Sequence, residues 1–328
     1  MRLGGTARFL AEAKNQDELK DLVDWSRQND LNFIMVGGGS NIIWRDEGYS
    51  GLVIVNKIKG REVLHEDESS VSIRAGAGEN WDDIVAWSVD KNLSGIEFLS
   101  AIPGSVGAAP VQNIGAYGAE LSSTLIEVGV FDSATGAFGS IVNSSCEFGY
   151  RTSRFKTADK GRFIITSVNL KLAKTNPKPP FYEVLQAYFD EHGIKDFTPQ
   201  TIRQAVIDIR SKKLPDPAKV ANNGSFFTNP FISTGQFEGL KAKYPDIKGW
   251  PDEFGQVKVA AGYLVEKAGF KGVHDADTGM AVNPDQALVL INEHAKSTAD
   301  LLKFKQKIVD KVKDMFGIAL EQEPELLP

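Results

Sequence analysis

The stretch "FIMVGGGSN" (Phe33–Asn41) decides the fold, because it joins a short apolar run to three consecutive glycines. The run Phe33–Val36 has the length of a buried strand. The glycines that follow permit positive φ and leave backbone N–H groups open to a phosphate. Taken alone, the motif is explained equally well by a tight turn. It is not the Rossmann pattern G-x-G-x-x-G, and no P-loop occurs in the chain.

Two more glycine-rich segments follow at positions that suggest one shared site. "VSIRAGAG" (Val71–Gly78) is a predicted strand that ends in glycines, and "IPGSVGAAPVQNIGAYGAE" (Ile102–Glu120) is long and nearly uncharged. A loop that long with so little charge is poorly suited to solvent and is better explained by close packing of its backbone on a flat, extended molecule. Three such loops favour a dinucleotide site over three independent turns.

The order of predicted elements indicates an α+β fold. Asn15 with Glu18 forms a capping pair before one helix, and Asn80 precedes another. The alternating run Phe163–Leu172 predicts a strand, and a long helix is expected from about Ser297 to Phe316.

The proline-rich segment "AKTNPKPP" (Ala173–Pro180) predicts a domain boundary. We therefore expect one domain over residues 1–174, with subdomains at about 1–56 and 57–174. A second domain, over residues 175–328, is expected to contain a linker, a connecting helix and a C-terminal tail that returns to the active site.

Composition excludes several classes of function. A net charge of −6 disfavours broad binding to nucleic acid. The single cysteine, Cys146, permits no intrachain disulfide and fits a reducing cytosol. None of the four histidines is spaced to share a metal with another histidine or with the cysteine, so we expect no metal site. No apolar run is long enough to span a membrane and the start has no signal-peptide character, so a cytoplasmic protein is expected.

Four polar residues stand out, and each allows two interpretations. Ser225, in "NNGSFFTNP", lies between a glycine and two phenylalanines and is either a turn serine or a positioned proton donor or nucleophile. Arg151 is either solvated or a clamp for a carboxylate or phosphate. Lys213 follows the apolar stripe of a predicted helix, where a lysine either binds a ligand or extends to solvent. Glu325 lies in an acidic tail whose apolar residues suggest that it returns to the body as a strand.

The ordered set of motifs closely resembles the UDP-N-acetylenolpyruvoylglucosamine reductase family, in its larger subtype. The family acts in the synthesis of bacterial peptidoglycan precursors. The resemblance runs almost from end to end and rests on "GGGSN", "GAGENW", "IPGSVGAAPVQNIGAYG", "FGYRTSRFK", "KLPDP", "NNGSFFTNP", "AAGYLVEKAGFKG", "NPDQALVLIN" and "EPEL".

The resemblance implies an FAD-binding fold of the vanillyl-alcohol oxidase (PCMH) type, followed by a smaller α+β substrate-binding domain. It implies non-covalent FAD, NADPH as co-substrate, and UDP-N-acetylglucosamine enolpyruvate as the substrate that is reduced to UDP-N-acetylmuramate. In this reaction flavin N5 gives hydride to C3 of the enolpyruvyl group, and Ser225 gives a proton to C2. We expect the protein to act as a monomer.

The resemblance also assigns site residues, position by position. The catalytic residues would be Arg151, Ser225 and Glu325. Those that bind the cofactor would be Gly37, Gly38, Gly39, Ser40, Asn41, Gly104, Ser105, Gly107, Asn113, Gly115 and Ala116. Those that bind the substrate would be Tyr182, Lys213, Asn229, Trp250, Lys258 and Gln286, with Tyr188 as an alternative to Tyr182.

Two other classes of protein remain open from the sequence. One is a different FAD-dependent oxidoreductase of the same fold, which would react rapidly with oxygen. The other is a non-catalytic UDP-sugar-binding or flavin-binding protein, which would bind a ligand without turnover.

Overall fold

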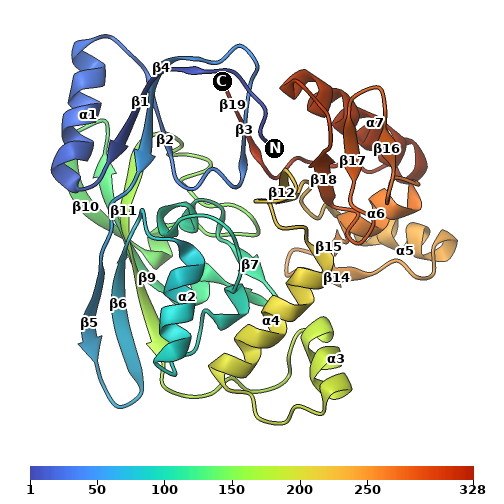
Figure 1. Ribbon diagram of the computed structural model, residues 1–328. Coiled ribbons are helices and arrows are strands. Elements are labelled where there is room, and N and C mark those ends of the chain that lie inside the picture. The colour runs from blue at the N-terminus through green and yellow to red at the C-terminus, as the bar shows by residue number, and fades with distance from the viewer. The chain divides into compact units, whose positions relative to one another are not determined.

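Phe33–Val36 forms strand β2, as predicted, in the computed structural model, which describes residues 1–328 (Figure 1). Contacts between residues group the chain into two units. The first, called here the N-terminal unit, contains Ala7–Gly39 and Tyr49–Arg210. The second, the C-terminal unit, contains Met1–Thr6, Ser40–Gly48 and Ser211–Pro328. The domain boundaries predicted from the sequence stay predictions.

The N-terminal unit begins with a small parallel sheet in the order β1-β4-β2. Its other strands are β1 (Ala7–Ala13) and β4 (Tyr49–Asn56). Helix α1 (Gln16–Gln28) follows β1, and the Asn15 side chain caps it by accepting a hydrogen bond from the backbone N–H of Glu18 at 2.8 Å. Both the capping pair and the helix are therefore confirmed.

An antiparallel five-stranded sheet, in the order β10-β9-β11-β6-β5, forms the larger part of this unit. Its strands are β5 (Arg61–Glu66), β6 (Ser70–Gly76), β9 (Leu125–Asp132), β10 (Ala137–Val142) and β11 (Phe163–Ala173). Helix α2 (Trp81–Asp90), capped by Asn80 as predicted, packs its Trp81 and Ile84 against one face of this sheet. Phe131 and Ile164 instead pack against the residues of β4 and α1, which joins the two sheets into one unit.

Short elements fill the uncharged segment that the sequence singled out. They are the 3₁₀ turns η1 (Glu97–Leu99), η2 (Val106–Ala108), η3 (Pro110–Gln112), η4 (Leu121–Ser123) and η5 (Asn143–Ser145), and the strand pair β7 (Gly115–Ala116) and β8 (Ala119–Glu120). Two helices follow the five-stranded sheet, α3 (Glu183–His192) and α4 (Pro199–Lys213). Helix α4 is the predicted helix that carries Lys213.

The C-terminal unit contains three further sheets. Their strands are β3 (Ile42–Trp44), β12 (Asn222–Ser225), β13 (Phe231–Ser233), β14 (Gly249–Pro251), β15 (Gln256–Val259), β16 (His274–Asp275), β17 (Met280–Val282), β18 (Val289–Asn292) and β19 (Glu325–Leu327). Its helices are α5 (Thr234–Lys243), α6 (Ala261–Lys267) and α7 (Thr298–Phe316). Ser297 caps α7, close to where the sequence placed the start of that helix.

The C-terminal tail returns to the body as a strand, as the sequence suggested. Strand β19 pairs in parallel with β3, so that Glu325 lies beside Ile42 and Leu327 beside Trp44. The last residues of the chain are therefore hydrogen-bonded to the segment that directly follows the "GGGSN" motif.

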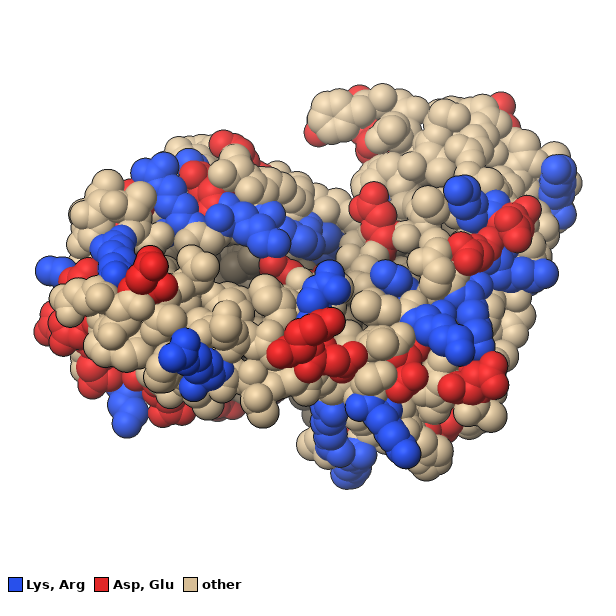
Figure 2. All heavy atoms as spheres, turned by 90° about the horizontal axis from the view of Figure 1, so that it is seen from above, with Lys and Arg blue, Asp and Glu red and all other residues tan.

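The surface shows no extended area of one charge on the face drawn in Figure 2, where acidic and basic side chains are interspersed. None of the helices combines the length and the apolar character that crossing a bilayer requires.

Candidate active site

The "GGGSN" loop lies against the uncharged segment within the N-terminal unit. A Cβ atom added to Gly37 would collide with Ser105 Oγ, and one added to Gly38 would lie 3.1 Å from Gly104 Cα. The Ser105 side chain is 8% exposed, and its Oγ has no hydrogen-bond partner. This arrangement fits the phosphate groups of FAD. A phosphate oxygen would accept a hydrogen bond from the Ser105 hydroxyl, and the phosphate would need the space that side chains at Gly37 and Gly38 would fill.

The two other glycine-rich loops are joined by backbone hydrogen bonds. The N–H of Gly107 donates to Ala77 O at 2.8 Å, and the N–H of Val106 donates to Glu79 O at 2.9 Å. Trp81 N donates to Gly104 O at 3.0 Å. The three glycine-rich loops therefore lie together, as expected if they bind one dinucleotide.

Asn113 organises the segment that carries Gly115 and Ala116. It is fully buried in a left-handed conformation, with φ of 46°. Its Nδ2 donates to Glu120 Oε2 at 2.8 Å and to Gly149 O at 3.3 Å, and its Oδ1 accepts from the N–H of Ser122 at 3.0 Å. Because its side-chain amide and its backbone N–H, which donates to Pro110 O at 3.3 Å, are all used within the protein, Asn113 holds this segment in shape.

Arg151 lies next to this segment in a constrained conformation. Its φ is 55°, which is costly for a residue with a side chain. Its Nη2 donates to Gly115 O at 2.7 Å, and Lys156 Nζ donates to Arg151 O at 3.1 Å. The structure thus fixes a guanidinium beside one of the residues predicted to contact the flavin.

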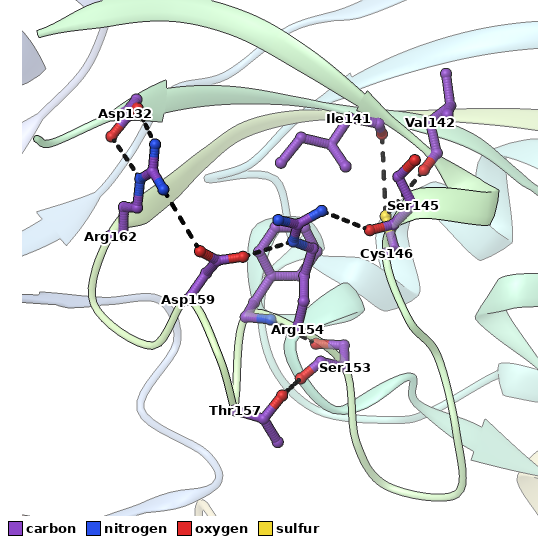
Figure 3. Close-up of polar contacts among 11 residues, drawn as sticks. Asp132, Ile141, Val142, Ser145, Cys146, Ser153, Arg154, Thr157, Asp159 and Arg162 are labelled. Carbon is purple, nitrogen blue, oxygen red and sulfur yellow. Dashed lines mark hydrogen bonds and ion pairs between the residues drawn. The ribbon is translucent and has the colours of Figure 1, made fainter. Parts of the chain in front are cut away.

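The residues after Arg151 form a network of ion pairs (Figure 3). Arg154 Nε lies 2.6 Å from Asp159 Oδ2, and its Nη1 donates to Ser145 O at 2.8 Å. Arg162 Nη2 lies 2.9 Å from Asp132 Oδ2, and the hydrogen bond from Arg162 lowers the pKa of Asp132 to about 2. Arg154, three residues after Arg151, therefore stabilises the loop.

Within the C-terminal unit, backbone pairing joins the segment that follows Ser225 to the segment that precedes Glu325. Phe227 bridges to Gln322, and the N–H of Glu323 donates to Phe226 O at 2.9 Å. This antiparallel register places the last residue of β12, Ser225, opposite the segment that leads into Glu325. Phe226 and Phe227 are at most 2% exposed, so they form the buried wall that the sequence suggested.

Both residues are also tied to the end of the "GGGSN" loop. The N–H of Glu325 donates to Asn41 O at 3.0 Å. Asn223, two residues before Ser225, donates from Nδ2 to Ser40 O at 2.9 Å and to Ile42 O at 3.2 Å. Residues 40–42 are thus a common support for two of the three candidate catalytic residues.

Four of the candidate substrate residues lie around residues 258–262. Lys258 on β15 pairs with Trp250 on β14. Asn229 Oδ1 accepts from the N–H of Ala261 at 2.9 Å, and Gln286 Oε1 lies 3.4 Å from where a Cβ atom on Gly262 would be. Residues distant in the sequence are therefore assembled at the start of α6.

The remaining candidates lie at helix ends. Lys213 is exposed at the last position of α4. Tyr182 is 41% exposed, and its ring lies 6.3 Å from that of Tyr117 in an edge-to-face arrangement. Tyr188 Oη instead donates to Asp208 at 2.6 Å, which raises the pKa of the phenol to about 12. Between the two tyrosines, Tyr182 is the one with an exposed side chain available to a ligand.

The sequence analysis did not single out Arg210, which lies on α4. Burial lowers the pKa of this guanidinium, despite its hydrogen bond with Tyr117 and the charge of Asp82. Arg210 follows Val206 by one helical step, so the argument applied to Lys213 would also have found it. The structure groups no three His, Cys, Asp or Glu side chains in the way a metal ion would need.

Family models and known proteins match this chain over most of its length. Residues 7–139 match the model of an FAD binding domain. Residues 216–327 match that of the UDP-N-acetylenolpyruvoylglucosamine reductase C-terminal domain. The chain is 40% identical over 326 residues to the UDP-N-acetylenolpyruvoylglucosamine reductase of Alcanivorax borkumensis, covering 99% of this chain and 92% of that one. The chain belongs to the UDP-N-acetylenolpyruvoylglucosamine reductase family.

Other members of the family support the same assignment. The Pseudomonas aeruginosa UDP-N-acetylenolpyruvoylglucosamine reductase is 38% identical over 320 residues, which cover 98% of this chain and 93% of that protein. The crystal structure of the Thermus caldophilus reductase is similar in fold, with a TM-score of 0.65 at 22% identity, over 97% of this chain and 91% of that chain. The predicted α+β fold with an FAD-binding domain is confirmed, and the chain is an FAD-dependent oxidoreductase.

Proposed function

We propose that the protein reduces UDP-N-acetylglucosamine enolpyruvate to UDP-N-acetylmuramate in the cytoplasm, as a monomer, during synthesis of peptidoglycan precursors. NADPH is the proposed electron donor. Membership of the reductase family supports the reaction. The observation that supports roles for this chain's own residues is that the segments of Ser225 and Glu325 are both hydrogen-bonded to residues 40–42.

FAD, when bound, supplies the hydride that adds to C3 of the enolpyruvyl group. The addition leaves negative charge at C2 and on the substrate carboxylate. Arg151 suits the stabilisation of that charge, because its guanidinium is planar, permanently charged and held by Gly115 O at 2.7 Å. Its constrained backbone fixes the direction from which the cation acts.

Ser225 is the proposed donor of the proton that C2 requires. A serine hydroxyl is a weak acid in water, but a strongly basic carbanion next to it makes the transfer favourable when water is excluded. The buried side chains of Phe226 and Phe227 support that exclusion. Glu325 is the third proposed catalytic residue, and the pairing of its segment with that of Phe226 and Phe227 supports this role.

The nucleotide part of the substrate is proposed to lie at the start of α6. Lys258 and Lys213 offer positive charge for the diphosphate, while Asn229 and Gln286 offer amide groups. Trp250, paired with Lys258, offers a flat surface for stacking. Tyr182 is proposed to close over the substrate from its exposed position before α3.

The test follows the flavin spectrum of the purified protein under anaerobic conditions. We expect a yellow protein whose visible absorbance is bleached by NADPH and restored by UDP-N-acetylglucosamine enolpyruvate, with UDP-N-acetylmuramate as the product. Rapid reoxidation by oxygen, without any response to the enolpyruvyl compound, would identify a different oxidoreductase of the same fold. A protein that binds UDP-sugars without bleaching or turnover would overturn the proposal.

A further inference from the structure

One carboxylate in the N-terminal unit connects three segments at the edge of the flavin cradle. Asp82 lies in the first turn of α2 and accepts two hydrogen bonds from the guanidinium group of Arg203. Arg203 Nη1 donates to Oδ1 at 2.6 Å, and Nη2 donates to Oδ2 at 2.9 Å. Its Oδ1 also accepts from the backbone N–H of Ala101 at 2.6 Å. The two side chains are 32% and 17% exposed, so this pair is shielded more than an ordinary surface ion pair.

The bond to Ala101 has a conformational role. Ala101 has φ of 57°, in the left-handed region that residues with a side chain avoid. Ile102, Pro103 and Gly104 follow directly, and Gly104 lies against Gly38 in the flavin cradle. A backbone that must turn left-handed at an alanine needs a partner that holds it there, and the Asp82 carboxylate supplies one.

Helices α2 and α4 lie next to each other (Figure 1). A second contact also joins them. Gln200 Nε2 donates to Val89 O at 2.6 Å and lies 2.7 Å from Asn92 Oδ1. Burial alone would raise the pKa of Asp82, but the hydrogen bonds from Arg203 and Ala101 outweigh it and lower the pKa. The carboxylate is therefore charged and fully engaged between α4 and the loop.

We propose that Asp82 and Arg203 are a positioning pair that holds the loop at Ala101–Gly104 in its flavin-binding conformation and links that loop to α4. By this link, movement of α4 changes the grip on FAD, and FAD in turn restrains α4. The inference needs only that FAD is the cofactor. It is independent of the substrate and of the roles proposed for Ser225 and Glu325.

The experiment measures the rate at which the holoprotein releases FAD, from the rise in flavin fluorescence. Asp82→Asn keeps an oxygen that can accept from Ala101 but loses the charge, and we expect release to accelerate roughly tenfold. Asp82→Ala loses both, and we expect roughly 10–100-fold. Arg203→Gln should match Asp82→Asn, and the double variant Asp82→Asn with Arg203→Gln should release FAD no faster than the faster single variant.

A rescue variant separates positioning from a general loss of stability. Glycine adopts positive φ without steric cost. The double variant Asp82→Ala with Ala101→Gly should therefore release FAD at least about threefold more slowly than Asp82→Ala alone. Lys174→Gln, which breaks the 2.7 Å pair with Glu66 in the same unit, is the matched control and should release FAD at the native rate. The proposal is overturned if Asp82→Ala releases FAD at the native rate, if Lys174→Gln accelerates release equally, or if Ala101→Gly gives no rescue.

Discussion

Replacing Asn223 with alanine tests whether the flavin loop and the proposed proton donor depend on one another. The Asn223 amide donates to Ser40 O at 2.9 Å and to Ile42 O at 3.2 Å, both within the C-terminal unit. Asn223→Ala removes both bonds and leaves two partly buried carbonyls without that donor. Ser225, two residues further along β12, would then lose one of the contacts that fix its position.

The size of the effect follows from the two bonds. A neutral hydrogen bond contributes about 0.5–1.5 kcal/mol, so we expect the variant to lose about 1–3 kcal/mol of its free energy of unfolding. The catalytic effect should be confined to one half of the reaction. Bleaching of the flavin by NADPH does not involve Ser225, whereas reoxidation by the enolpyruvyl substrate does, and we expect reoxidation alone to slow by roughly tenfold or more.

Asn143→Ala is the matched control for this variant. The Asn143 amide also donates to two backbone carbonyls, of Ser122 at 2.7 Å and Leu125 at 2.8 Å, but in the N-terminal unit. Denaturant unfolding and stopped-flow absorbance should show a similar loss of stability in both proteins and slow reoxidation only in Asn223→Ala. If the two variants reoxidise at the same rate, Asn223 supports the fold and has no part in placing Ser225.

The other variants test single residues. Ser225→Ala should leave bleaching by NADPH unchanged and slow reoxidation by roughly 10²–10⁴-fold, and a native reoxidation rate would return this residue to the role of a turn serine. Lys213→Ala should weaken substrate binding by about 1.5–3 kcal/mol with the flavin content intact, and unchanged affinity with lower thermal stability would show a structural lysine. Burial raises the pKa of the Cys146 thiol to about 11, so native protein at pH 8 should react with a disulfide reagent far more slowly than unfolded protein, and equal rates would contradict its buried position.

The sequence predicted best what depends on near neighbours. Asn15 and Asn80 cap helices because a cap needs only the next three residues, and both were recognisable. The glycine loops could be grouped because their composition is unusual over a short length. The return of the tail was predictable from its apolar residues, but its partner strand β3 was not, since pairing across most of the chain leaves no local signal.

The missed residues depend on contacts between distant segments. In the sequence, Asp82 is typical of the acidic residues found in the first turn of a helix. Only the structure shows its contacts with Arg203 and Ala101. Asn223 reads as part of a turn until residues 40–42 lie next to it. The sequence motifs predicted the candidate site, while Asp82 and Asn223 became recognisable only from the structure.

The division of the C-terminal unit along the chain affects the order in which the two units can fold during synthesis. Its first two segments, Met1–Thr6 and Ser40–Gly48, leave the ribosome early, but their partners come from Ser211–Pro328. At common rates of translation, roughly the last 120 residues take about 6–24 s to synthesise. During that time, β3 exists without β19, its partner strand at the very end of the chain. A nascent chain can therefore complete its N-terminal unit during translation, but Glu325 reaches its place only after the residues of β19 have been synthesised.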